Sequence, residues 1–411
     1  MPLYNLACLY RDLGRKREAE ETFQRALELR PNYLEARLNL ATLTASQTAR
    51  RAEARRMYDQ LIRLAPTYPE VWYNRGVLDL AQGSVDSARA DFERCVRIDS
   101  TFAKAWLNLG VVRSRAGRTD EAERAYRRAL VADPLHQRAK LNLAILLGNR
   151  PDGHAEAYRL YAQMLQASPS DAEPYHGRGM LEMDEGALEA AQRDLEQAVK
   201  LDPKYARAWF HLGVLHGKAG RSDAAIAAYR GAILADANYT KARVNLAVHL
   251  ARTKRYAEAA DINREIVAKD PAYSRAWNNL AIALGHLDDF DGAERAYHKV
   301  LALDADNARA WQNLGTLYTR RKKIDRAIEC YREALAIEPG NEAARYNLAL
   351  AFSRQGKLDL ANGEIARLTR LGPESPKARR LIRQFMALTA DGKRPPLQAA
   401  DASGEDDAAG K

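Results

Sequence analysis

An alanine recurs along this sequence at a nearly constant interval, and this regularity constrains the fold more than any other feature. The step is 34 residues, with two steps of 35. The column comprises Ala19, Ala54, Ala88, Ala122, Ala157, Ala191, Ala225, Ala259, Ala293, Ala327 and Ala361. A period of about 20–50 residues indicates repeated structural units that stack in a row. The 411 residues are therefore predicted to form one long array, although their number alone would suggest two or three domains.

Each repeat is predicted to form two helices joined by a short turn, as residues 206–239 illustrate. Gly220 ends the first helix and Ser222 can cap the second. Gly213 belongs to a column of small residues that lets two helix backbones approach closely. Tyr229 belongs to a mostly aromatic column that fills the wedge between units. A proline closes most repeats, because it lacks the amide donor that a continuing helix needs.

These columns resemble the tetratricopeptide repeat, whose signature reads W-x2-L-G-x2-Y, then A-x3-F, then A-x4-P. Eleven copies lie in register across residues 1–375. They begin near Met1, Leu34, Pro69, Ala103, Gln137, Ala172, Ala206, Thr240, Ser274, Ala308 and Glu342. The resemblance implies an all-α fold, a right-handed α-solenoid of about eleven helix-turn-helix units held by nearest-neighbour contacts.

The two ends of the chain differ from its middle. Ser375 and Pro376 form a good cap and first turn, so we expect a basic amphipathic helix over residues 376–389 that caps the solenoid. A helix lying on a membrane surface is the alternative. Residues 390–411, rich in Ala, Gly, Asp and Pro, are expected to be disordered. The first helix begins at Met1 without a cap, so either Met1 is not the natural start or upstream units have been lost.

Composition limits the class of protein. The three cysteines, Cys8, Cys95 and Cys330, are far apart, which fits neither a disulfide framework nor a metal site and favours a reducing, cytoplasmic location. No apolar run approaches the ~18 residues of a transmembrane helix. The sequence contains neither a phosphate-binding G-x4-G-K-[ST] loop nor an H-E-x-x-H motif. We therefore expect no catalytic residues, no cofactor and no metal.

One column of the first helix is almost entirely asparagine. In the family that this sequence resembles, the first helices line the concave surface. A carboxamide can both donate to and accept from the backbone of an extended peptide. The repeat array of O-linked N-acetylglucosamine transferases is similar in this respect. Alternatively, asparagine is simply the commonest residue here in idealised repeats of the family. The candidate peptide-binding residues are Asn108, Asn142, Asn245, Asn279, Asn313 and Asn347.

Basic residues flank the asparagine column on both sides. Four residues before it stand Lys104, Arg138, Arg207, Lys241, Arg275 and Arg309, and seven residues after it stand, among others, Arg252 and Arg320. Spacings of four and seven keep these side chains on one face of a helix. From the seventh unit onward the groove is therefore predicted to be basic and to attract acidic peptide segments. The alternative is a merely solvated face.

The sequence thus predicts a non-enzymatic protein-interaction scaffold that binds an extended, acidic peptide or protein partner in its concave groove. The alternative is the substrate-recognition part of an O-linked glycosyltransferase whose catalytic part lies outside this chain. Nucleic acid is not the expected partner, because the basic columns lack interleaved aromatic residues that could stack on bases. The formal charge of +10 agrees with an acidic partner. The sequence does not specify the oligomeric state.

Overall fold

The computed structural model describes residues 2–371 and 376–389, and these residues form helices without any strand. The all-α prediction is confirmed. The first helices of the repeats are α1 (Pro2–Asp12), α3 (Leu34–Ala45), α5 (Pro69–Ala81), α7 (Ala103–Arg115), α9 (Gln137–Gly148), α11 (Ala172–Asp184), α13 (Ala206–Lys218), α15 (Thr240–Arg252), α17 (Ser274–His286), α19 (Ala308–Arg320) and α21 (Glu342–Arg354).

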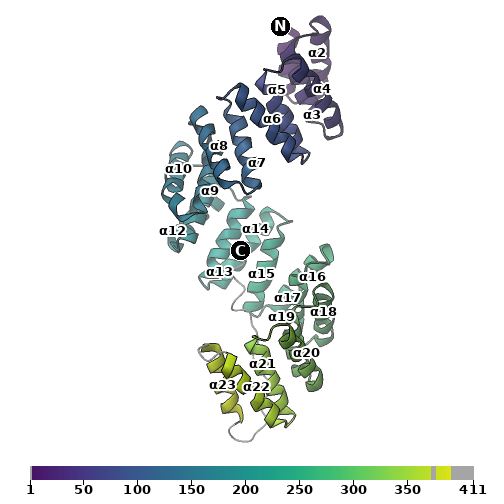
Figure 1. Ribbon diagram of the computed structural model, residues 1–411, viewed down its shortest axis with the longest axis vertical. Helices are drawn as coiled ribbons and strands as arrows, with labels where there is room; N and C mark the ends of the chain where they lie inside the picture. Colours follow the sequence, from purple (N-terminus) through teal and green to yellow (C-terminus); the bar gives the residue numbers. More distant parts are fainter. Residues whose placement is uncertain (1, 372–375, 390–411) are drawn as a thin grey trace. The chain divides into compact units, whose positions relative to one another are not determined.

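The second helices alternate with the first helices along the chain (Figure 1). They are α2 (Lys16–Leu29), α4 (Arg51–Leu64), α6 (Val85–Ile98), α8 (Thr119–Ala132), α10 (His154–Ala167), α12 (Leu188–Leu201), α14 (Ser222–Ala235), α16 (Tyr256–Lys269), α18 (Phe290–Leu303), α20 (Ile324–Ile337) and α22 (Leu358–Leu371). The two 35-residue repeats accommodate their extra residue in short 3₁₀ turns, η1 (Thr48–Arg50) and η2 (Pro151–Gly153).

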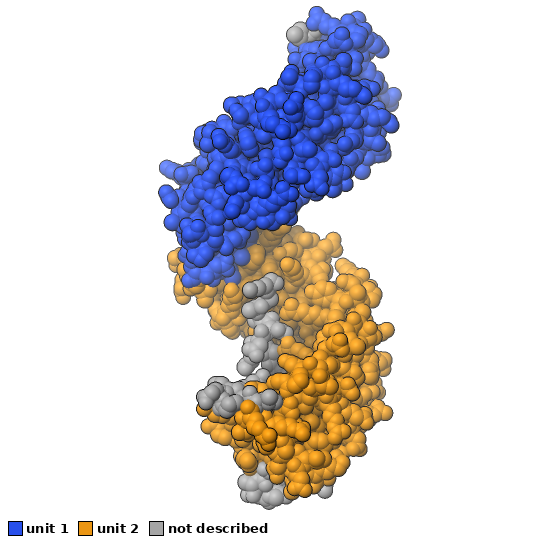
Figure 2. Space-filling view, viewed as in Figure 1, with its two compact units in different colours: residues 1–185 blue, residues 186–411 orange. Residues whose placement is uncertain are grey.

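The chain divides into two compact units, residues 1–185 and 186–411 (Figure 2). Within each unit a helix contacts the helices next to it in sequence, and several first helices also contact the first helix of the following repeat. The last helix, α23 (Pro376–Thr389), packs on α21 and α22. The expected tail, residues 390–411, lies outside the described residues. No described helix is long and apolar enough to cross a membrane.

The two helices of a repeat meet where a small residue faces an aromatic ring. Gly213 of α13 lies so close to Tyr229 of α14 that an added Cβ atom would be 2.6 Å from the ring. Tyr229 is almost fully buried. The same contact joins Gly76 to Phe92 and Gly315 to Tyr331. The glycine therefore sets how closely the two helices approach, and the ring fills the space between them.

The tryptophan column locks the turn that precedes each first helix. The indole nitrogen donates to the backbone carbonyl six residues earlier, over 2.9–3.1 Å, in all five tryptophans: Trp72, Trp106, Trp209, Trp277 and Trp311. Arginine replaces tryptophan in three repeats; the guanidinium donates to the equivalent carbonyl at Arg37 and Arg345, whereas Arg243 pairs with Glu265. The bond from the tryptophan satisfies a carbonyl in the turn, two residues beyond the end of the second helix.

The turn between the two helices of a repeat requires a left-handed backbone conformation. Glycine supplies it in several repeats, for example at Gly220 with a φ of 72°. In three consecutive repeats a residue with a side chain adopts the same conformation instead: Lys254, Asp288 and Lys322, at φ of 61–62°. This arrangement costs about 1 kcal/mol or more per residue, so these repeats lose some stability in their turns.

The contact between Gly213 and Tyr229 yields a test of the packing. Gly213→Ala should destabilise the protein by about 1–3 kcal/mol, because the new methyl group cannot enter without displacing the ring. Gly363→Ala, in α22, is the control, since an added Cβ atom there meets nothing within 4 Å. That change should stabilise the helix by up to about 1 kcal/mol. Urea unfolding measures the free energy of unfolding of both variants. A Gly213→Ala protein as stable as the wild type would contradict the close contact between Gly213 and Tyr229.

Candidate functional site

Charge is segregated between the two helices of the repeats in the second unit. The first helices α13, α15, α17 and α19 carry eight Lys or Arg residues and no Asp or Glu. Their partners α14, α16, α18 and α20 carry nine carboxylates and seven Lys or Arg residues, so that their charges nearly cancel. We call the exposed side of α13, α15, α17 and α19 the first-helix face. Its positive charge follows from this segregation and not only from the charge of the whole chain.

The predicted basic residues occupy different environments. Lys104, Arg207, Lys241 and Arg275 are exposed, and none forms an ion pair within the described part of the chain. Arg252 and Arg309 are exposed as well. Two predicted site residues are instead engaged in the fold. Arg138 pairs with Glu173 at 3.0 Å, and Arg320 donates to the Gly285 carbonyl and to Asp288.

The asparagine column is more structural than the sequence indicates. Asn245 donates to the Tyr229 hydroxyl of the preceding second helix at 3.5 Å. Burial raises the pKa of Tyr126 and Tyr73, and Asn142 and Asn108, which lie near the two hydroxyls, act more weakly to lower it. The column thus helps to link neighbouring repeats. This agrees with the alternative that asparagine is simply the commonest residue at this position in the repeat family.

Two members of the column do not face an open groove, contrary to expectation. Asn313 is 8% exposed and Asn347 only 2%. Asn313 donates to Asn278 in the neighbouring first helix. Asn347 lies on α21, which is in contact with α19, α20, α22 and α23. Helix packing at this end of the array therefore covers them, and neither is available to a peptide in this structure. Asn279 is half-buried, and its amide nitrogen has no hydrogen-bond partner within the described residues.

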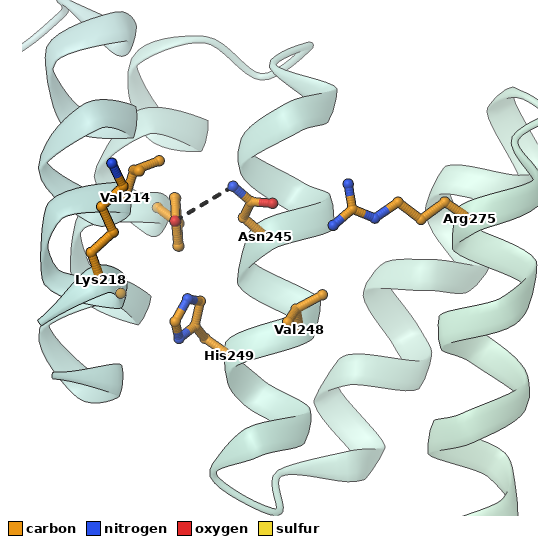
Figure 3. Close-up of a pocket in the computed structure, with 8 residues that line it drawn as sticks. Val214, Lys218, Asn245, Val248, His249 and Arg275 are labelled. Carbon is orange, nitrogen blue, oxygen red and sulfur yellow. Dashed lines mark hydrogen bonds between the residues drawn. The ribbon is translucent and has the colours of Figure 1, made fainter. Parts of the chain in front are cut away.

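A pocket opens on the first-helix face between α13, α15 and α17 (Figure 3). Its cavity measures about 20 Å³, room for about one water molecule, and it opens to solvent. Asn245 lies between the Tyr229 hydroxyl and the guanidinium of Arg275. The pocket contains two cations and no carboxylate. It is lined by Val214, Gly217, Lys218, Tyr229, Asn245, Val248, His249 and Arg275.

The histidines of this region are held neutral. Burial, together with the charges of Arg207 and Lys241, lowers the pKa of His211 to about 4, although a hydrogen bond to the backbone of Arg207 acts in the opposite direction. Burial also lowers the pKa of His249, with Arg252 adding to the effect. His249 faces Gly217 and the ring of Tyr229, 5.6 Å from it. The positive charge near neutral pH therefore comes from lysine and arginine, and the histidines supply hydrogen-bonding groups.

His249 and Val248 are pocket residues that the sequence analysis did not identify. A signal for His249 exists, because the same position is aliphatic in most other repeats, for example Leu43, Leu181 and Leu215. A histidine in an otherwise aliphatic, buried column indicates a place where a polar side chain is used for binding or for a specific packing contact. Val248 offers no comparable signal.

The lowered pKa of His211 predicts acid sensitivity. The unfolded chain binds a proton near pH 6.5 and the folded chain only near pH 4, so the free energy of unfolding should decrease as pH falls between these values. His211→Asn, which restores the residue of the column, should remove about 1–2 kcal/mol of the loss between pH 7.5 and pH 5. Exposed His298→Asn is the control. Equal losses in wild type and His211→Asn, measured by urea unfolding, would refute the argument.

Comparisons with known proteins agree with the repeat architecture. Models of the tetratricopeptide repeat match residues 2–33, 43–101, 79–146 and 176–239. A model described as the C-terminal domain of cilia and flagella-associated protein 70 matches residues 210–411. The chain belongs to the tetratricopeptide repeat family. A search of the curated proteins gave no match.

Several solved structures are similar to this chain. The TPR protein YrrB, described as having an unusual peptide-binding site, is 21% identical with a TM-score of 0.41, over 45% of this chain and 95% of its own. The Cut9–Hcn1 structure is 14% identical with a TM-score of 0.44, and the match covers 93% of this chain and 95% of the other. A tetratricopeptide repeat protein from Parabacteroides merdae is 20% identical with a TM-score of 0.47, over 60% and 96%.

Proposed function

We propose that this protein is a non-enzymatic scaffold whose first-helix face binds an extended, acidic peptide segment of a protein partner. The observation that carries the proposal is the complete absence of carboxylates from four consecutive first helices, α13 to α19. A repeat fold does not require this, since the first helices α3, α5 and α11 contain acidic residues. The cytoplasmic location expected from the separated cysteines is part of the same proposal.

The pocket supplies the chemistry that such a ligand needs. Arg275 and Lys218 can form charge-assisted hydrogen bonds to a carboxylate, which are about twice as strong as neutral ones. Beside its bond to Tyr229, Asn245 keeps a carbonyl oxygen and a second N–H for the peptide backbone, and Val214 and Val248 offer apolar contact. Arg207 and Lys241 extend the positive surface beyond the pocket. An extended segment could therefore contact several repeats at once.

The alternative, a substrate-recognition part of an O-linked glycosyltransferase, has less support. None of the matching family models describes a glycosyltransferase. The asparagine column, which suggested this alternative, is largely engaged between repeats at Asn142, Asn245 and Asn313. A basic, carboxylate-free face is the more distinctive feature of this chain.

The proposal predicts that binding depends on the exposed cations. Lys241→Glu combined with Arg275→Glu should weaken binding of a fluorescent Glu-rich dodecapeptide at least tenfold, because hydrogen bonds to charged groups contribute about 1.5–3 kcal/mol each. Binding by the wild type should also fall as salt is added. Fluorescence polarisation at two salt concentrations measures both effects.

A matched control lies on the other side of the same unit. Arg295→Glu with Lys299→Glu, on exposed positions of α18, changes the net charge equally but away from the first-helix face. This variant should bind the peptide nearly as the wild type does. Equal loss in the two variants would mean that only the overall charge matters. A wild type without affinity for the Glu-rich peptide would contradict the proposal directly.

Mutation of Asn245 and Asn279 distinguishes a role in ligand binding from a role in joining the repeats. Asn245→Ala with Asn279→Ala should weaken binding by roughly 5- to 150-fold if both amides bond the peptide backbone. Loss of affinity without a lower melting temperature would assign the two residues to the ligand. A lower melting temperature with unchanged affinity would show that they serve only to join the repeats.

A further inference from the structure

A second basic surface lies on the opposite set of helices, in the first unit. It consists of exposed positions on the second helices α4, α6, α8 and α10 (Figure 1). These positions lie two, six and nine residues after the recurrent alanine, so they share one face of each helix. Seven of the twelve positions are arginine and none is acidic. The arginine stripe comprises Arg56, Arg63, Arg94, Arg97, Arg124, Arg128 and Arg159.

The stripe is not required by the fold. Equivalent positions of the second unit carry either sign: Asp261 and Glu265 on α16 and Glu329 and Glu333 on α20 are acidic, whereas Arg295 and Lys299 on α18 are basic. Because the repeats have the same architecture, the fold accepts either sign of charge here. The accumulation of one sign in α4 to α10 therefore indicates selection for something other than stability.

In the described part of the chain the arginines of the stripe lack carboxylate partners, although Arg94 lies over the Trp72 ring and Arg159 Nε donates to the Ala155 carbonyl. Within the described residues none of the seven forms an ion pair with a carboxylate, whereas Arg50, Arg75 and Arg127 of the same unit are each held by two. Five N–H donors on each guanidinium are thus directed largely to solvent. Arginine suits phosphate better than lysine does, because its planar fork can donate two parallel hydrogen bonds to one phosphate.

Exposed aliphatic side chains accompany the stripe. Leu64 follows Arg63 at the end of α4 and is 55% exposed. Val131 occupies a stripe position on α8 and is 75% exposed, and Leu135, in the turn after α8, is 74% exposed. A nucleic acid backbone would leave these side chains in water. A lipid bilayer would accept them at the boundary between headgroups and acyl chains, while the arginines contact the phosphates.

We propose that the arginine stripe docks the first unit on an anionic lipid bilayer, with Leu64, Val131 and Leu135 entering the headgroup region. This surface is independent of the peptide-binding proposal, because it lies in the other unit and on the other set of helices. The two sites together would hold an acidic protein segment at a membrane surface, although each can be tested alone.

Flotation with lipid vesicles tests the docking. The full chain should float with vesicles of phosphatidylcholine containing 30% phosphatidylglycerol at 0.1 M salt, and not with pure phosphatidylcholine. Arg97→Gln, Arg124→Gln and Arg128→Gln together should weaken binding about 100-fold, since each arginine near such a surface contributes about a factor of five. A triple Ser variant of Leu64, Val131 and Leu135 should lose the binding that persists at higher salt.

The matched control removes the same charge from the first-helix face. Arg207→Gln, Lys241→Gln and Arg275→Gln together should leave vesicle binding unchanged and abolish binding of the Glu-rich peptide, and the stripe variant should show the reverse. Equal loss of vesicle binding in both triple variants would overturn the proposal. So would wild-type binding to a 20-base-pair DNA duplex that is tighter than binding to anionic vesicles. Release from vesicles by millimolar inorganic phosphate would indicate a simple anion site and would equally refute docking on a bilayer.

Discussion

The contact between a small residue and an aromatic ring inside most of the repeats is the constraint on which the rest of the structure depends. Gly213 can approach Tyr229 only because it lacks a side chain, and Tyr229 then presents its hydroxyl to Asn245 of the next repeat. One interaction thus fixes the angle within a repeat and prepares the link to its neighbour. Since all such contacts are between neighbours, stability is close to a sum of local terms.

The sequence predicts the helices well, because the repeat period averages over eleven copies. The expected starts Ala206 and Thr240 are the first residues of α13 and α15. The site is harder to predict. Asn313 and Asn347 share the column of Asn245, yet their burial depends on which helices cover them in space. Similarly, the bond between Arg138 and Glu173 joins adjacent repeats, and no single column reveals it.

Charge segregation gives the two sides of the array different chemistry. In α13 to α20 the carboxylates lie only on the second helices, whereas Lys and Arg residues occur on both sets of helices. In the first unit exposed arginines line the second helices α4 to α10. Because the repeat backbone is the same throughout, surface charge can vary from repeat to repeat at little cost to the fold. An array of this kind can therefore carry separate binding surfaces without separate domains.

The five tryptophans report on the turns that they lock. Each indole is partly buried and bonded to a backbone carbonyl between consecutive repeats. When a turn opens, its indole becomes hydrated and its fluorescence shifts to the red. Trp72 and Trp106 lie in the first unit, and Trp209, Trp277 and Trp311 in the second. Replacing all but one of them by phenylalanine would give a spectroscopic record of which part of the array melts first.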